Sequence, residues 1–338
     1  MRMNTLKKFT DKKINIRKNT LGSKVLDDIL FSFADADGTA SVKLAPLCEE
    51  ASKKAEILLE RTLEDGYDKY IVLIEDDVTV YFTSEISKIY ALYDIKANYD
   101  CGINCGVIYG RAICQMRGLK SYLPPKNEID DFKRQIDLLL SLGYNTLTLE
   151  LGGAMEYKSH PEINEGWVEY CQIFKEYSGK SQDVQRMYIY PKTSIHVETG
   201  GYDYLTQVQI KSIIDYCYDR HIEIIPETPC LSHADYLLYR HPELSEFADD
   251  LLPNNVCPSN EGYYELLFDI LDEVVELFKP ARINIGHDEA YVIGCCEKCR
   301  QKSAADIYAY EVTRIHDYLA SKGVTLVDTA QGTTYKMD

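Results

Sequence analysis

The stretch INIGHDEAY, residues 283–291, decides the fold. Its first four residues alternate in the manner of a strand, and the chain then turns at Gly286 into His287, Asp288 and Glu289. Charged side chains are seldom placed beside an apolar strand without a partner or a function. The stretch therefore predicts a fold that gathers functional groups at the ends of its strands.

An alternation of strands and helices surrounds this stretch from about residue 113 onwards. Runs typical of strands occur at residues 114–123, 145–151, 222–227, 281–286 and 324–330. Helical patterns separate them, including a capping box of Thr206 and Gln209 and an amphipathic run over 259–278. No hairpin signals join these strands, which indicates parallel strands with right-handed crossovers in an α/β fold.

Polar side chains cluster where these strands end. They are Arg117, Glu150, Glu227 with His233, and the group His287, Asp288 and Glu289. A parallel barrel builds its site at the carboxyl ends of its strands, and an open doubly wound sheet binds ligands there as well. The first strand is not followed by a glycine-rich phosphate loop, which argues against a nucleotide site.

Residues 1–105 form a separate pattern. A helical run over 45–64 precedes two β-rich runs, 70–74 and 78–82, which Glu75, Asp76 and Asp77 join as a hairpin. A further helical run follows at 86–95. This pattern predicts a small N-terminal α/β layer.

Composition excludes several classes of protein. The chain has 338 residues and a net charge of −17, which argues against nucleic acid or an anionic membrane as a partner, because both require a basic face. The basic N-terminus lacks the apolar core of a signal peptide, and no apolar run has the length of a membrane helix. The eleven cysteines are scattered, so a cytoplasmic protein with reduced thiols is expected.

Three of the cysteines lie close together, at Cys295, Cys296 and Cys299. The CxxC of Cys296 and Cys299 is one half of a common zinc motif, but no second CxxC exists in the chain. His287 or a distant cysteine would have to complete a zinc site. The sequence therefore favours a protein without metal or other cofactor.

Four motifs in order resemble the family-20 glycoside hydrolases, the β-N-acetylhexosaminidases. Arg117 and Gly118 in QMRGLK resemble the Arg-Gly that opens the barrel of that family. IIDYCYDRHIEIIPE, residues 213–227, resembles its helix–strand step, and His233 in PCLSHAD resembles a histidine that follows. INIGHDE resembles the ending of its fourth strand. The resemblance spans about residues 65–330.

The resemblance implies a small α/β domain, residues 1–105, ahead of a (β/α)8 TIM-type barrel, residues 106–338. It also implies glycosidase activity towards a carbohydrate substrate, a terminal β-linked N-acetylhexosamine or a related hexose. Catalysis in that family is retaining and substrate-assisted, since the acetamido oxygen of the substrate attacks in place of an enzyme carboxylate.

The same resemblance implies roles for individual residues. Glu289 would be the general acid and base, and Asp288 would orient the acetamido group and stabilise the cationic intermediate. Adjacent carboxylates push their pKa values apart, so such a pair can hold one proton. Arg117 would donate hydrogen bonds to sugar hydroxyls, and His233 would lie beside the acid.

Two positions depart from the family pattern and are further candidates for substrate binding. Glu150, in TLTLELGGAMEY, stands where the family has histidine and aspartate. His287 replaces a glycine before Asp288 and Glu289, where it adds a donor to the site or fills space.

A complete barrel needs eight strand–helix units, and about five are found here. The sequence therefore predicts an incomplete barrel, truncated at its C-terminus. Open sheet edges expose unpaired backbone groups, so such a barrel is expected to be unstable or to need a partner, for instance in a homo-oligomer.

Two alternatives to an active glycosidase remain open on the sequence. The first is an inactive carbohydrate-binding or fragmentary relative that lacks the C-terminal half of the pocket. The second is a metal-dependent barrel hydrolase that uses His233, His287, Asp288 and Glu289.

Overall fold

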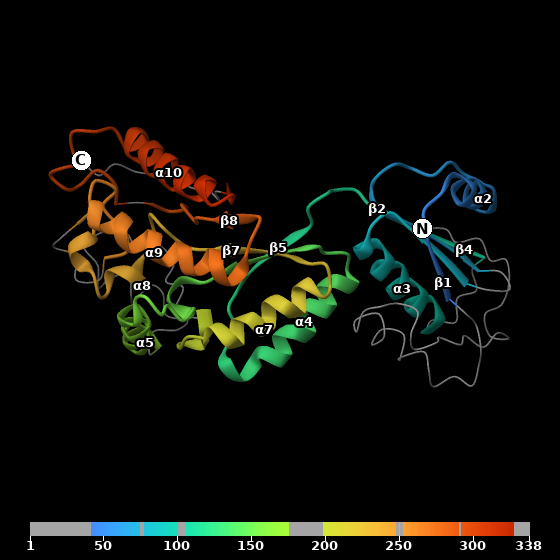
Figure 1. Ribbon diagram of the computed structural model, residues 1–338, viewed down its shortest axis with the longest axis horizontal. Helices are drawn as coiled ribbons and strands as arrows, with labels where there is room; N and C mark the ends of the chain where they lie inside the picture. The colour runs from blue at the N-terminus through green and yellow to red at the C-terminus, as the bar shows by residue number, and fades with distance from the viewer. Residues whose placement is uncertain are drawn as a thin grey trace. The chain divides into compact units, whose positions relative to one another are not determined.

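The computed structural model describes residues 42–74, 78–100, 106–175, 199–247, 250, 253–290 and 292–327 (Figure 1). They divide into two compact units. The first contains the described residues up to Gly118 with the segments Gln135–Thr146 and Tyr216–Glu223, and the second contains the remainder.

The first unit is built on a four-stranded sheet in the order β1-β3-β2-β4. Its strands are β1 (Val42–Pro46), β2 (Tyr67–Ile74), β3 (Val78–Phe82) and β4 (Val107–Ala112), with the helices α2 (Glu49–Leu59) and α3 (Glu85–Asp100). β2 and β3 pair in antiparallel fashion, which confirms the predicted hairpin pairing. The residues of the predicted turn itself, 75–77, lie outside the described residues.

The first unit continues past residues 105 and 106, where the sequence predicts the domain boundary. β4 pairs with β2 and completes the first sheet, so this unit extends beyond residue 105. Val107 and Tyr109 of β4 pack into the same core cluster as Ile71 of β2. The sequence analysis did not assign this segment, in which Gly106 and Gly110 weaken the strand pattern.

The second unit is built on a five-stranded sheet in the order β5-β6-β7-β8-β9. The strands are β5 (Gly118–Tyr122), β6 (Thr146–Glu150), β7 (Glu223–Glu227), β8 (Arg282–Asn284) and β9 (Thr325–Val327). Each falls within a predicted strand, and β8 is parallel to both of its neighbours. Strand order follows chain order without the reversal of a doubly wound sheet, as in a barrel.

Helices connect these strands (Figure 1). They are α4 (Ile129–Ser141), preceded by the 3-10 turn η2 (Lys126–Glu128), α5 (Pro161–Lys175), α7 (Gln207–Tyr218), the short α8 (Asp235–Leu238), α9 (Glu261–Phe278) and α10 (Ala304–Ser321), with 3-10 turns η3 (Gly152–Ala154), η4 (Thr199–Gly201) and η5 (Pro242–Leu244). The capping box is confirmed, since Thr206 N donates to Gln209 Oε1 at 2.9 Å and Gln209 N to Thr206 Oγ1 at 3.3 Å.

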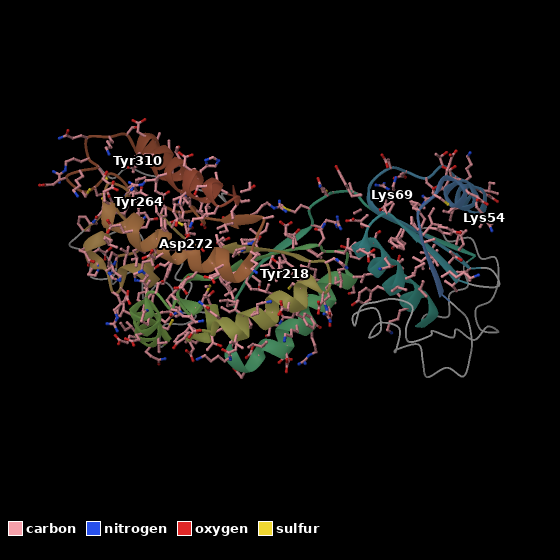
Figure 2. The ribbon with its side chains drawn as sticks, in the orientation of Figure 1. Lys54, Lys69, Tyr218, Tyr264, Asp272 and Tyr310 are labelled. Atoms are coloured by element: carbon pink, nitrogen blue, oxygen red, sulfur yellow. The ribbon has the colours of Figure 1, made fainter. Side chains whose placement is uncertain are left out.

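Helices α9 and α10 pack together through aromatic side chains. Tyr264 and Tyr310 meet edge to face with ring centroids 6.4 Å apart (Figure 2). Phe268 stacks on Tyr318 at 3.7 Å, and the Tyr318 hydroxyl donates to Asp272 Oδ1 at 2.7 Å. Aromatic contacts add to the free energy gained by burying the rings, and here they fix α10 beside α9.

Within the described part of the chain, every helix is too short or too polar to cross a lipid bilayer.

Candidate active site

The carboxyl ends of three neighbouring strands bring polar side chains together in the second unit. β6 ends at Glu150, β7 at Glu227 and β8 at Asn284, and all three side chains are buried. Lys120 reaches them from β5. Because parallel strands end on one side of a sheet, residues far apart in the sequence form one polar floor there.

Lys120 holds two buried carboxylates in this floor. Its Nζ lies 3.0 Å from Glu150 Oε2 and 2.5 Å from Glu227 Oε1, and Asn284 Nδ2 donates to Glu227 Oε2 at 2.9 Å. Burial raises the pKa of Glu227 to about 7, assisted by the charges of Glu150 and Asp288 and opposed by Lys120. For Lys120 itself, burial favours the neutral form, but the two glutamates outweigh it and raise the pKa.

Gly286 allows the chain to turn away from β8 into the acid pair. Its φ is +54°, in the left-handed region that glycine adopts without strain. A Cβ at this position would also lie 3.3 Å from Glu227 Oε1, inside the polar floor. The backbone conformation therefore favours glycine, and Glu227 would have to shift slightly to admit a Cβ.

His233, Asp288 and Glu289 meet beside this floor. His233 Nε2 lies 3.6 Å from Asp288 Oδ2 and 3.7 Å from Glu289 Oε2. The imidazole is 4% exposed, whereas the side chains of Asp288 and Glu289 are 25% and 33% exposed. Solvent therefore reaches both carboxylates but not the histidine. His233 and Glu289 both have positive φ, 49° and 56°. Such strain in non-glycine residues is concentrated at functional sites.

The contact between His233 and Asp288 sets the ionisation of both groups. Burial alone would raise the pKa of Asp288, but His233 and the charge of Lys120 outweigh it and lower the pKa to about 2. Burial alone would lower the pKa of His233, but Asp288 outweighs it and raises the pKa. Asp288 is therefore ionised across the physiological pH range, which suits a residue that stabilises positive charge.

Replacing Asp288 by Asn is expected to lower the pKa of His233, because burial then acts on the imidazole without the charge of Asp288. A pH titration of the ¹⁵N-histidine-labelled chain by NMR measures this pKa, with His233→Gln to assign the resonance. The wild-type value is expected above the ordinary 6.5. An unchanged pKa in Asp288→Asn would show that the two side chains do not interact in solution.

His287 packs inside the second unit. Its Nε2 lies 2.8 Å from Glu311 Oε2, both side chains are fully buried, and the Tyr263 hydroxyl donates to Glu311 Oε1 at 3.0 Å. Of the two roles predicted for His287, this contact favours the filling of space over a contact with substrate. The pair ties the segment that carries Asp288 to helix α10.

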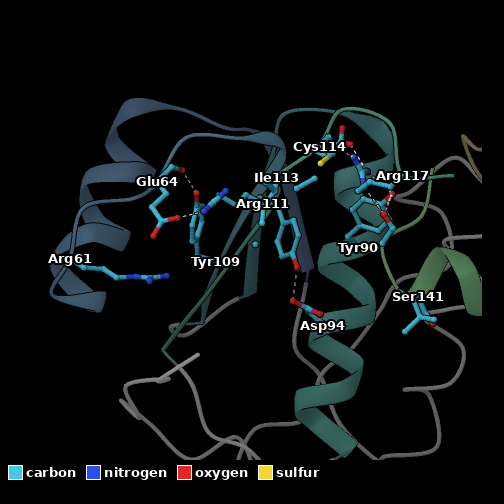
Figure 3. A pocket seen from close by; sticks show the side chains of 16 residues that line it. Arg61, Glu64, Tyr90, Asp94, Tyr109, Arg111, Ile113, Cys114, Arg117 and Ser141 are labelled. Atoms are coloured by element: carbon cyan, nitrogen blue, oxygen red, sulfur yellow. Dashed lines mark hydrogen bonds and ion pairs between the residues drawn. The ribbon is translucent and has the colours of Figure 1, made fainter. Parts of the chain in front are cut away.

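Arg117 lies in a pocket of the first unit, shown in Figure 3. Its Nη2 donates to Asp68 Oδ2 at 2.7 Å and to the Tyr90 hydroxyl at 3.0 Å, and its Nε donates to Gly143 O at 2.6 Å. The residues that line this pocket do not include Asp288 or Glu289. The sugar contact expected of Arg117 stays a prediction, and in this structure its donors serve the first unit.

Three residues of the site escaped the sequence analysis. Lys120 was counted as part of a strand, and β5 is an edge strand, where an exposed lysine is common. Asn284 was hidden inside the apolar alternation of β8. Glu311 had a clear signal, because it stands on the apolar stripe of α10 between Ile307 and Ile315.

The metal-dependent alternative finds no support in the described residues. The group of side chains that lie close enough together to hold an ion does not include His233, His287, Asp288 or Glu289. Glu150, which was expected to contact substrate, lies in the polar floor beside Lys120. A direct contact between Glu150 and a sugar remains a prediction.

Known proteins are similar to this chain in sequence. The family model described as glycosyl hydrolase family 20, catalytic domain, matches residues 127–332, which is more than half of the chain. A β-hexosaminidase of Akkermansia muciniphila is 23% identical over 91% of this chain and 64% of its own length. A β-hexosaminidase of Porphyromonas gingivalis is 25% identical over 52% of this chain and 21% of its own length. The chain thus spans less than two thirds of these relatives.

Solved structures share the fold. The family-20 β-N-acetylhexosaminidase of Streptomyces coelicolor has a TM-score of 0.64 at 16% identity, over 94% of this chain and 62% of that one. A mutant Streptomyces plicatus β-hexosaminidase in complex with its product GlcNAc has a TM-score of 0.64 at 17% identity and the same coverage. The expected α/β fold with a partial barrel is confirmed. On the match of the family model, the chain belongs to glycosyl hydrolase family 20.

Proposed function

We propose that this chain carries the catalytic acid pair of a retaining β-N-acetylhexosaminidase, with Glu289 as general acid and base and Asp288 as the partner of the acetamido group. The observation that carries the proposal is the placement of both carboxylates at the end of β8, with His233 within 3.7 Å of each. The curated relatives named above are β-hexosaminidases, which supports an amino-sugar glycoside as substrate.

The reaction proceeds in two steps. In the first, Glu289 gives its proton to the glycosidic oxygen as the bond to the anomeric carbon breaks, and the acetamido oxygen of the substrate bonds to that carbon. In the second, the Glu289 carboxylate takes a proton from water, the water oxygen bonds to the anomeric carbon, and the bond from that carbon to the acetamido oxygen breaks, which restores the acetamido group. Two inversions at one carbon give overall retention.

Asp288 and His233 assist both steps through charge. The intermediate is a positively charged oxazolinium-like ring. An ionised Asp288 lowers the free energy of this intermediate by accepting a hydrogen bond from the N–H of the acetamido group. The low pKa of Asp288, about 2, keeps this carboxylate negative. His233 lies 3.6 Å from Asp288, and the positive charges of His233 and Lys120 favour the ionised form of Asp288.

Two chromogenic substrates that carry the same leaving group but different sugars test the proposal. The chain is expected to hydrolyse a β-N-acetylglucosaminide at least about a hundredfold faster than the β-glucoside, because only the first carries the internal nucleophile. Release of the chromophore is followed by absorbance. Equal rates would exclude substrate assistance, and sugar binding without release from folded protein would favour the inactive carbohydrate-binding alternative.

A further inference from the structure

Three cysteine thiols and one carboxylate converge at a second place in the second unit. They are Cys257, which precedes α9, Cys296 and Cys299 from the segment between β8 and α10, and Glu246. One potential ligand atom from each lies within 4.8 Å of every other. Cys257 is thus the distant cysteine that the CxxC of Cys296 and Cys299 lacked in the sequence.

The spacing of the sulfurs fits a tetrahedral ion. A zinc ion about 2.3 Å from tetrahedrally arranged thiolates separates their sulfurs by about 3.8 Å. Cys257 Sγ lies 3.7 Å from Cys299 Sγ and 3.4 Å from Cys296 Sγ. One cysteine approaches two others at once, whereas a disulfide unites only two sulfurs and brings them to about 2.05 Å.

Glu246 offers a carboxylate oxygen as the fourth ligand, and this carboxylate is held in place by hydrogen bonds. Its Oε1 accepts hydrogen bonds from the backbone N–H of Cys295 at 2.6 Å and of Cys296 at 3.1 Å. Its Oε2 is buried and has no hydrogen-bond partner among the described residues. Glu246 is 1% exposed and forms no ion pair within the described part of the chain. A cation beside it would stabilise the ionised form of such a buried carboxylate.

We propose that Cys257, Cys296, Cys299 and Glu246 bind one structural Zn²⁺. Thiolate sulfur selects zinc among the common divalent cations, and four protein ligands leave no open position for catalysis. The site revises the expectation of a protein without metal. It is independent of the reaction assigned to Glu289, because the four ligands are not part of the acid pair.

The position of the ion gives it a structural role for the catalytic segments. Glu246 and Cys257 belong to the connection from β7 to α9, which also carries His233. Cys296 and Cys299 belong to the connection from β8 to α10, which also carries Asp288 and Glu289. The ion cross-links these two connections, as does the hydrogen bond from the Ser232 hydroxyl to Asp288 O.

Metal analysis of the purified full chain tests the site. After expression in zinc-supplemented defined medium and removal of loosely bound ions, mass spectrometry is expected to find about one zinc per chain. The double variant Cys296→Ser and Cys299→Ser is expected to retain at least about tenfold less zinc. Cys114→Ser, which removes an exposed thiol of the first unit, is the matched control and is expected to retain zinc fully.

A measurement on unmodified protein covers the case in which the double variant fails to fold. The wild-type chain loaded with cobalt in place of zinc is expected to show thiolate-to-metal charge-transfer absorption and the visible bands of a tetrahedral ion. Glu246→Gln is expected to keep the charge-transfer absorption and to change the visible bands. A folded wild-type chain that binds neither zinc nor cobalt, that binds iron instead, or that contains a disulfide between Cys257 and Cys296 would overturn the assignment.

Discussion

Glu289→Gln is expected to lower kcat/KM for an aryl β-N-acetylglucosaminide about 10²–10⁴-fold, the range that general acid catalysis supplies. The amide keeps the shape of the side chain but cannot protonate the glycosidic oxygen. Steady-state hydrolysis measures the loss. Glu276→Gln, which changes an exposed glutamate of α9 in the same way, is the matched control and is expected to leave kcat/KM unchanged.

The dependence on the leaving group separates loss of the acid from a general defect. A phenol of low pKa departs without a proton, so its glycoside is expected to lose less rate in Glu289→Gln than the glycoside of a poor leaving group. An equal loss for both glycosides would assign Glu289 a role in binding. A variant with full activity would remove Glu289 from the mechanism.

Glu311→Ala is expected to lower the free energy of unfolding by about 3–5 kcal/mol, since removal of one partner leaves a buried polar group without compensation. The change removes the partner of His287, whose side chain is fully buried and lies 2.8 Å from Glu311. The Tyr263 hydroxyl also loses an acceptor. Urea denaturation followed by circular dichroism gives the free energy.

An exposed acidic residue on the same helix provides the control. The side chain of Asp317 is 74% exposed, and Asp317→Ala is expected to change the free energy of unfolding by less than about 0.5 kcal/mol. If Glu311→Ala changed it as little, the contact between His287 and Glu311 would not hold the segment after β8.

Local patterns in the sequence were sufficient to predict most of the second unit. The strands of its sheet lie within the predicted runs, and the runs of β6 to β9 are short apolar segments that polar residues end or follow. The capping box at Thr206 also formed, since it depends on residues only three apart. By contrast, α5 (Pro161–Lys175) was not predicted, because its buried residues include the polar Asn164 beside Trp167 and Tyr170.

The parts of the site that depend on long-range contacts could not be predicted. Lys120 and Glu227 are separated by 107 residues, and only the strand order brings them together. Cys257 lies 39 residues before Cys296, and no spacing rule relates a lone cysteine to a CxxC at that distance. The family resemblance pointed to Asp288, Glu289 and His233, but the contacts of Lys120, Asn284 and Glu311 were visible only in the structure.

The anomeric form of the sugar first released tests the central claim most directly. Proton NMR follows hydrolysis of a β-N-acetylglucosaminide before the free sugar mutarotates. Attack by the acetamido oxygen followed by water predicts that the β-anomer appears first. Initial release of the α-anomer would mean direct attack by water and would contradict the roles of Asp288 and Glu289, and a folded chain that releases no sugar would contradict the proposed activity.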